Sequence, residues 1–181
     1  MRTKIHTTKK LEKLVKKLIK SELPEKEENN SELGKWNATV FYVDRKKCWL
    51  LTNKPTKYNL ILSDIKASDL NQIDDIFKNA LHGQLLYDGI VTELEKLDRT
   101  IGKLDFRPTD NDRSTTGFQN QRLYELEWWK YDYGNLENMP LKDLTNRMNT
   151  GPIHIGKGRK MSDYTNSIKE MKKLLGGIKT V

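Results

Sequence analysis

The sequence predicts an α+β fold in which about five or six helices pack on a small antiparallel sheet. Three strand-like runs between residues 35 and 65 follow one another with short links, as in an antiparallel meander. Helical periodicity dominates on both sides of them, above all in a mainly helical C-terminal part, residues 103–181, that should pack on the sheet. A chain of 181 residues can bury a real core, so we expect one domain over residues 1–181.

The chain begins with a short N-terminal strand, expected at residues 2–7 (RTKIHT), followed by a basic amphipathic helix. Apolar residues recur there at helical spacing, with lysines on the opposite face: Leu11, Leu14, Val15, Leu18 and Ile19. Such a helix can bind a membrane surface or a calmodulin-like partner, but its single apolar stripe favours packing on a sheet. Pro24 ends the helix, and residues 22–34 are expected to form an acidic linker.

The three central strands are rich in aromatic and β-branched residues: KWNATVFYV (35–43), KCWLLTN (47–53) and KYNLILSDI (57–65). The first link, DRKK, is short enough for a hairpin, and NKPTK suits a slightly longer one. These links make the three strands an antiparallel meander.

Helices account for most of the remaining chain. We expect one from Ser68 or Asp69 to about residue 82, and another over 84–98 that Gly89 weakens. A third should start near residues 115–117 and end at about 131, and a short fourth should cover 140–148. The last is expected over 163–175, with Ser162 as its cap and two glycines, 176 and 177, at its end.

Composition describes a polar protein, with 35% hydrophobic and 32% charged residues. No apolar run approaches the roughly 18 residues that cross a bilayer, and the N-terminus lacks the pattern of a secretory signal. Cys48 is the only cysteine, which excludes an internal disulfide and a thiolate metal cluster. We therefore expect a cytoplasmic protein that does not enter a membrane.

Positive charge gathers at the two ends of the chain, whose net charge is +8. Residues 1–20 hold eight Lys/Arg and one Glu, residues 157–181 hold seven and two acids, and residues 64–98 hold three Lys and eight acids. If the ends meet in the fold, they form a basic face suited to phosphates or an acidic protein. The alternative is that lysine-rich helices merely solvate their outer faces.

The most polar stretch is TDNDRSTTGFQNQ, residues 109–121, which precedes the aromatic segment YELEWWKYDYG. Arg113 offers a fork of donors, Ser114 a hydroxyl, and Gly117 close approach of the backbone; Asn120 lies about one turn further along. One interpretation is an anion or phosphate pocket floored by two tryptophans, 128 and 129. The other is a capped helix start in which Arg113 binds a carboxylate such as Glu125.

A second basic segment, GKGRK at residues 156–160, lacks the spacing and the Lys-Ser/Thr pair of a P-loop. Its cationic side chains could still contact phosphate at the edge of a site: Lys157, Arg159 and Lys160.

Catalytic patterns are sparse. The three histidines, 6, 82 and 154, lie in different segments and form no metal-binding pair. Asp110 and Asp112 resemble the start of a calcium loop, but Gln121 stands where such a loop needs Glu. We therefore expect no metal, no cofactor and no catalytic residue, and regard a small metal-dependent nuclease using Asp110, Asp112 and His154 as the least favoured class.

Several short segments follow one another in the order of a known family pattern. With the family's own pattern in parentheses, these segments are Thr8–Leu11 (T-K-K-L), Trp36–Ala38 (W-x-A), Asp44–Lys47 (D-R-R-K), Thr52–Asn53 (T-N), Asp112–Gln121 (D/N-R-S-V-L-G-S-M-N-D) and Met148–Ile153 (L-N-x-x-P-M). Through them the chain resembles an uncharacterised bacterial and phage family, domain of unknown function 6933. Two threonines, 115 and 116, replace apolar residues of the pattern, and Gln121 replaces an acid. The resemblance implies no established activity, but it places Arg45, Arg113, Gly117 and Asn120 in the family pattern.

These observations favour a non-enzymatic basic binding or regulatory protein that contacts a phosphate-bearing partner such as nucleic acid. Its expected binding residues are Trp36, Arg45, Arg113, Ser114 and Asn120, with Lys157, Arg159 and Lys160 at the rim. The main alternative is an interaction protein, such as an antitoxin or an inhibitor of a defence nuclease, whose basic ends bind an acidic protein surface.

Overall fold

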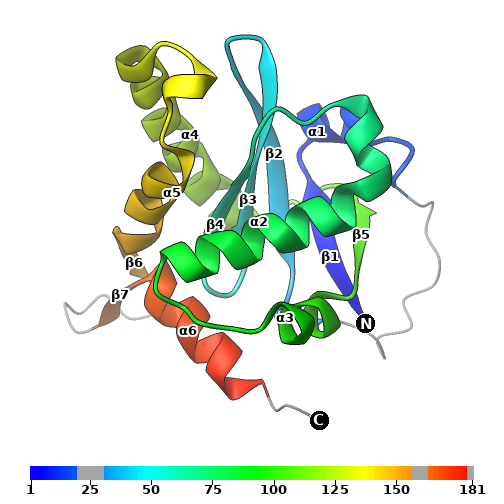
Figure 1. Ribbon diagram of the computed structural model, residues 1–181, viewed down its shortest axis with the longest axis vertical. Coiled ribbons are helices and arrows are strands. Elements are labelled where there is room, and N and C mark those ends of the chain that lie inside the picture. Colours follow the sequence, from blue (N-terminus) through cyan, green and yellow to red (C-terminus); the bar gives the residue numbers. More distant parts are fainter. Residues whose placement is uncertain (20–30, 156–162, 179–181) are drawn as a thin grey trace.

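A five-stranded mixed sheet forms the centre of the molecule. The structure is a computed structural model that describes residues 1–19, 31–155 and 163–178. The sheet has the strand order β4-β3-β2-β1-β5, with β1 (Arg2–Thr7), β2 (Trp36–Val43), β3 (Lys46–Asn53), β4 (Asn59–Leu62) and β5 (Lys103–Arg107). A separate small ribbon pairs β6 (Pro152–His154) with β7 (Tyr164–Asn166). Helices pack around this framework, so the predicted α+β fold is confirmed (Figure 1).

The antiparallel meander β2-β3-β4 is present as predicted. Its first turn consists of two residues, Asp44 and Arg45, between the paired residues Val43 and Lys46. Both turn residues have positive φ, 47° and 64°, as the tightest hairpin turns require.

The N-terminal strand β1 is also present, but it makes the sheet mixed because it pairs in parallel with β2 and with β5. Strand β5 is one that sequence patterning did not predict. It has only five residues, KLDFR, and its apolar pattern is too short to distinguish from a loop.

One face of the sheet carries the larger core. Along β2, Trp36, Ala38 and Val40 point to this face, where they meet α1 (Lys9–Leu14), α2 (Ile73–Tyr87), α3 (Leu94–Ile101) and α6 (Ser167–Gly177). The Trp36 ring packs edge-on against Phe77 of α2 at 5.3 Å between centroids. Figure 1 shows α2 lying across the strands.

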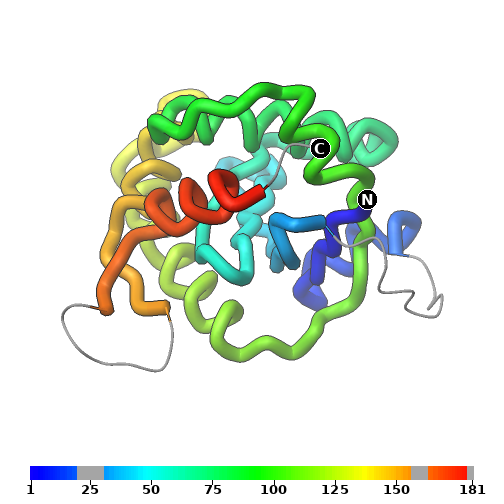
Figure 2. Tube along the Cα trace, turned by 90° about the horizontal axis from the view of Figure 1, so that it is seen from below, coloured from blue at the N-terminus to red at the C-terminus, as the bar shows by residue number. Residues whose placement is uncertain are grey.

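The opposite face is covered by α4 (Arg113–Tyr133) and α5 (Leu141–Thr150), which are joined through a short 3-10 turn at Leu136–Asn138. Phe41 and Val43, which alternate with the residues of the first core, pack there with Leu126 and Met148. Figure 2 shows the strands between the α2–α3 layer and α4.

Several helix boundaries differ from the expected ones. The first helix ends at Leu14, and Ile19 forms an isolated bridge with Phe106 instead of continuing the helix. The expected break at Gly83 is absent, because buried leucines on both sides hold α2 against the core up to Tyr87. The break falls instead at Gly89, whose φ is +75°.

The last helix starts later than predicted. Asn166 caps it by accepting a hydrogen bond from the backbone N–H of Lys169 at 2.8 Å, while residues 164–166 form β7. Ser162, the expected cap, lies outside the described residues, as do Pro24 and most of the expected linker. The described end of that linker is anchored, because Leu33 is in the core and the Ser31 N–H bonds to the carbonyl of Arg2 at 2.8 Å.

The lysine-rich helices α1 and α6 lie apart in both views (Figures 1 and 2). Within the described residues, the two basic helices therefore do not lie side by side, and the basic residues Lys157, Arg159 and Lys160 lie outside that part of the chain. No helix over these residues is long and apolar enough to cross a membrane.

Candidate functional site

The polar stretch that precedes the aromatic segment begins as a capped helix start. Asp112 is the N-cap of α4, and one of its carboxylate oxygens accepts from the backbone N–H groups of Ser114 and Thr115 at 3.0 and 3.2 Å. The other accepts from the Thr115 hydroxyl at 2.8 Å. Capping explains why α4 starts at Arg113, two residues before the earliest expected position.

Two lysines from the loop after β3 neutralise this helix start. Lys54 Nζ lies 3.0 Å from Asp112 and 3.3 Å from Asp110, and Lys57 Nζ donates to the Thr115 hydroxyl at 2.8 Å. Although burial raises the pKa of Asp112, hydrogen bonds from Lys54 and Thr115 outweigh it and hold that pKa below its usual range. Burial lowers the pKa of Lys57.

The predicted arginines are not brought together. Arg45 is exposed in the turn before β3, whereas Arg113 is exposed next to Asp112, which pairs with Lys54 just after β3. Eight extended residues separate these positions, a span of about 26 Å. Arg113 does not hold Glu125 either, because Arg122 forms that ion pair.

The other expected binding residues are dispersed too. Trp36 is fully buried in the larger core, so it cannot form part of a contact surface; its aromatic strand pattern indicates packing instead. Ser114 is exposed in the first turn of α4. Lys157, Arg159 and Lys160 lie outside the described residues.

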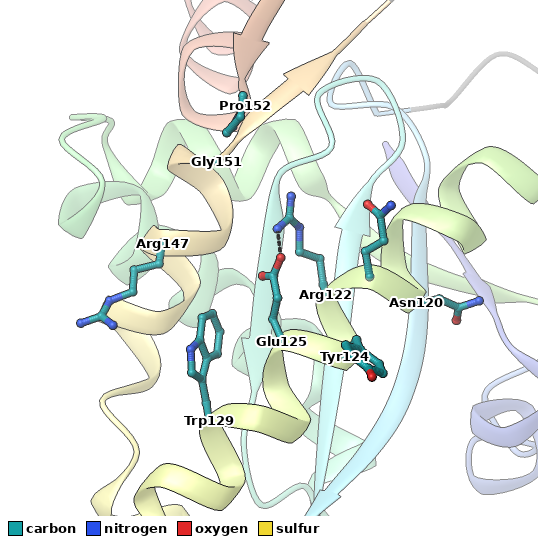
Figure 3. Close-up of a pocket in the computed structure, with 9 residues that line it drawn as sticks. Asn120, Arg122, Tyr124, Glu125, Trp129, Arg147, Gly151 and Pro152 are labelled. Carbon is teal, nitrogen blue, oxygen red and sulfur yellow. Dashed lines mark hydrogen bonds and ion pairs between the residues drawn. The ribbon is translucent and has the colours of Figure 1, made fainter.

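Asn120 does line a pocket, together with one of the two predicted tryptophans. The pocket has a volume of about 890 Å³ and lies between the middle of α4 and the end of α5, where the chain enters β6 (Figure 3). Its lining consists of Asn120, Gln121, Arg122, Tyr124, Glu125, Trp129, Arg147, Gly151 and Pro152.

Arg122 is the central charged group of this pocket. Only 9% of the residue is exposed, its guanidinium lies 4.7 Å from the centre of the Phe118 ring, and Nη1 pairs with the carboxylate of Glu125. Its Nε is buried and has no hydrogen-bond partner among the described residues. A donor on a buried cation is costly to leave without an acceptor.

The remaining walls combine a cation with an aromatic ring. Arg147 projects from α5 and pairs with Asp143 of the same helix at 2.8 Å, with more than half of its side chain exposed. Trp129 packs its ring against the smaller core and lines the pocket from α4. A planar group could stack on this ring while an attached anion meets one of the arginines.

An exposed aromatic stripe adjoins the pocket on α4. Tyr124, Trp128 and Tyr131 are 67%, 61% and 86% exposed, and they follow one another at helical spacings of four and three. Tyr124 also lines the pocket and packs edge-on against Trp128 at 6.5 Å. The second expected tryptophan, Trp128, therefore belongs to this outer stripe.

The residues of the nuclease hypothesis do not meet. Asp110 and Asp112 are hydrogen-bonded at the start of α4, whereas His154 lies in β6 with its ring against Tyr164 at 5.7 Å. The described ranges contain no group of three or more His, Cys, Asp or Glu side chains that could hold a metal. No catalytic constellation of this kind is assembled there.

Sequence reasoning missed Arg122 and Arg147, and it paired Glu125 with Arg113 instead of Arg122. The spacing of Arg122 and Glu125 suits an ion pair on one helix, but it is common on solvated helices and identifies no site. Arg147 and Gly151 meet α4 only through the packing of α5, which no local pattern reveals.

Comparison with known proteins identifies the family. No curated protein and no solved structure matches the chain. One family model matches residues 4–170, described as Domain of unknown function (DUF6933), and so covers both sheet faces and the pocket. The chain belongs to this family of unknown function.

Proposed function

We propose that this protein is a non-enzymatic binding protein whose α4–α5 pocket holds a phosphate group of a nucleotide or nucleic acid. The observation that carries the proposal is the environment of Arg122. Its buried guanidinium borders an open pocket, and its Nε has no hydrogen-bond partner in the described ranges.

The chemistry of Arg122 suits a phosphate. A guanidinium offers five N–H donors in a rigid fork, and Glu125 accepts only at Nη1. Once the side chain turns its buried Nε towards the pocket, the edge that carries Nε–H can donate two parallel hydrogen bonds to phosphate oxygens.

The pocket also supplies contacts for the rest of such a ligand. Trp129 offers an aromatic wall for a base, and Asn120 an amide that can donate and accept hydrogen bonds. Arg147 adds a second cation from α5. In the sequence, Lys157, Arg159 and Lys160 follow shortly after Pro152 of the pocket, so they remain candidates for its rim.

Binding of short fluorescein-labelled single-stranded RNA and DNA, followed by anisotropy, tests the proposal. Arg147→Gln should weaken binding about tenfold, and Arg122→Lys should weaken it at least as much because the ammonium lacks the fork. Unlabelled nucleotides and inorganic phosphate, used as competitors, show which part of the ligand is recognised.

Arg99→Gln is the matched control, because Arg99 is an exposed arginine on α3, remote from the pocket. Affinity should fall steeply between about 50 and about 300 mM salt, since phosphate binding releases counterions. Equal affinities for Arg147→Gln and Arg99→Gln, or affinity indifferent to salt, would exclude recognition at this pocket.

The exposed aromatic stripe favours a second candidate, a protein partner. Trp, Tyr and Arg dominate the energetics of protein interfaces, and Tyr124, Trp128 and Tyr131 present two of these residue types beside the arginines of the pocket. Capture of one stoichiometric protein after nuclease treatment, abolished by Trp128→Ala, would support this candidate. If the partner is still captured by Trp128→Ala, the stripe is excluded as the surface that binds it.

A further inference from the structure

A second polar centre lies at the ends of β1 and β5. These strands run parallel, and the chain that leaves β5 passes the end of β1 before α4 begins. His6 of β1 is the register partner of Asn37 on β2, so the two side chains leave the same face about 5 Å apart. Asp110 reaches Asn37 from the loop, since it accepts a hydrogen bond from Asn37 at 3.2 Å, and it is near enough to His6 to interact with it electrostatically.

The hydrogen bond made by His6 fixes its tautomer. Nδ1 lies 3.0 Å from the backbone carbonyl of Pro108, and because a carbonyl only accepts, Nδ1 carries the proton. In the neutral ring, Nε2 then presents a lone pair. Nε2 is buried and has no hydrogen-bond partner within the described part of the chain.

Asn37 presents a second orphaned acceptor. The residue is 6% exposed, and its Nδ2 donates to the Asp110 carboxylate, which fixes the orientation of the amide. Its Oδ1 is therefore the remaining atom, and it too is buried without a partner among the residues described. A buried acceptor left without a hydrogen bond is unfavourable, so both atoms would gain from a further partner.

We propose that His6 Nε2, Asn37 Oδ1 and the Asp110 carboxylate form a binding site for one divalent transition-metal ion. A cation would satisfy the two orphaned acceptors and bind the Asp110 carboxylate at the same time, and one nitrogen with two oxygens suits borderline ions such as Co²⁺, Ni²⁺ or Zn²⁺. A histidine that donates its other N–H to a backbone carbonyl is the usual arrangement behind a metal ligand.

The surrounding charges permit a cation. Arg107, the register partner of His6 on β5, is bound by Asp105 through Nε and Nη2, both at 2.9 Å. Lys54 pairs with Asp110 at 3.3 Å and with Asp112 at 3.0 Å. It therefore keeps Asp112 as a partner when the metal ion binds Asp110. The site does not depend on the α4–α5 pocket, and its test is separate.

Titration of the tag-free, chelator-treated protein with Co²⁺ tests the site, through visible absorption bands and calorimetry. One ion should bind per chain, and His6→Gln should weaken binding at least tenfold. His82→Gln is the matched control, because the His82 Nε2 likewise lies 2.9 Å from a backbone carbonyl, that of Thr92. The control variant should bind like the parent protein.

Nitrogen-detected NMR of the imidazole rings in the parent protein provides a readout that needs no variant. Zn²⁺ should shift the His6 Nε2 resonance at one equivalent, before those of His82 and His154. Absence of Co²⁺ binding, binding unaffected by His6→Gln, or a first Zn²⁺ shift at another histidine would overturn the proposal.

Discussion

At the residue scale, Asp112 both caps α4 and pairs with Lys54. Asp112→Ala should lower the free energy of unfolding by about 1–2 kcal/mol at neutral pH, because two backbone N–H groups lose their acceptor. The pKa of Asp112 is lower in the folded than in the unfolded protein, so this stabilisation is present above the unfolded pKa of about 3.9. It is lost as pH falls toward the folded value.

Urea unfolding of the parent and Asp112→Ala at pH 7 and near pH 3 measures this difference. Asp132→Ala, at an exposed position near the other end of α4, is the control and should change little at either pH. A stability difference for Asp112→Ala that does not shrink on acidification would show that the negative charge of Asp112 contributes nothing to stability.

A second residue-scale prediction concerns Asp88, where α2 ends. Its carboxylate accepts four side-chain hydrogen bonds at 2.6–3.2 Å, from Tyr58, Gln84, Asn146 and Asn149. Asp88→Ala should cost about 3 kcal/mol or more, because several buried donors lose their acceptor, whereas Tyr58→Phe removes one donor and should cost about 1 kcal/mol. Equal costs in urea unfolding would show that Asp88 is not the hub of this network.

At the element scale, two glycines should respond in opposite ways to alanine. Gly117 lies within α4, and an added Cβ would meet nothing within 4 Å, so Gly117→Ala should stabilise by about 0.5–1 kcal/mol. Gly102 ends α3 with φ +62°, and a Cβ there would lie 2.1 Å from the Met1 carbonyl oxygen, so Gly102→Ala should destabilise. Thermal unfolding measures both; destabilisation by Gly117→Ala would indicate a close contact at that helix face.

The elements also show which parts of the fold can be predicted from sequence patterns. The meander β2-β3-β4 is predictable because short links leave consecutive strands only antiparallel pairing. Strand β5 could not be predicted because its five residues form a strand only by pairing with β1. The predicted start of α6 was wrong because the sequence offers two caps, Ser162 and Asn166. The pairing of β7 with β6 extends the strand to Asn166, which then caps the helix.

At the scale of the whole molecule, the net charge does not reveal where the charged residues lie. The net charge of +8 suggests one basic face, yet α1 and α6 lie apart and β3 separates Arg45 from Arg113. Asn120 and Trp129 were predicted to lie beside an anion pocket, and both line the pocket between α4 and α5. Its central cation is Arg122 instead of Arg113, because Asp112 places Arg113 in the exposed first turn of α4.

The most direct measurement is an NMR titration of the Nε–Hε groups of the eight arginines with a mononucleotide and with inorganic phosphate. Arg122→Lys assigns the resonance of interest by its loss. The Arg122 signal should shift first and saturate, because its Nε gains an acceptor, while those of Arg45 and Arg99 should barely move. An Arg122 signal that stays in place while exposed arginines shift together would contradict phosphate binding at the α4–α5 pocket.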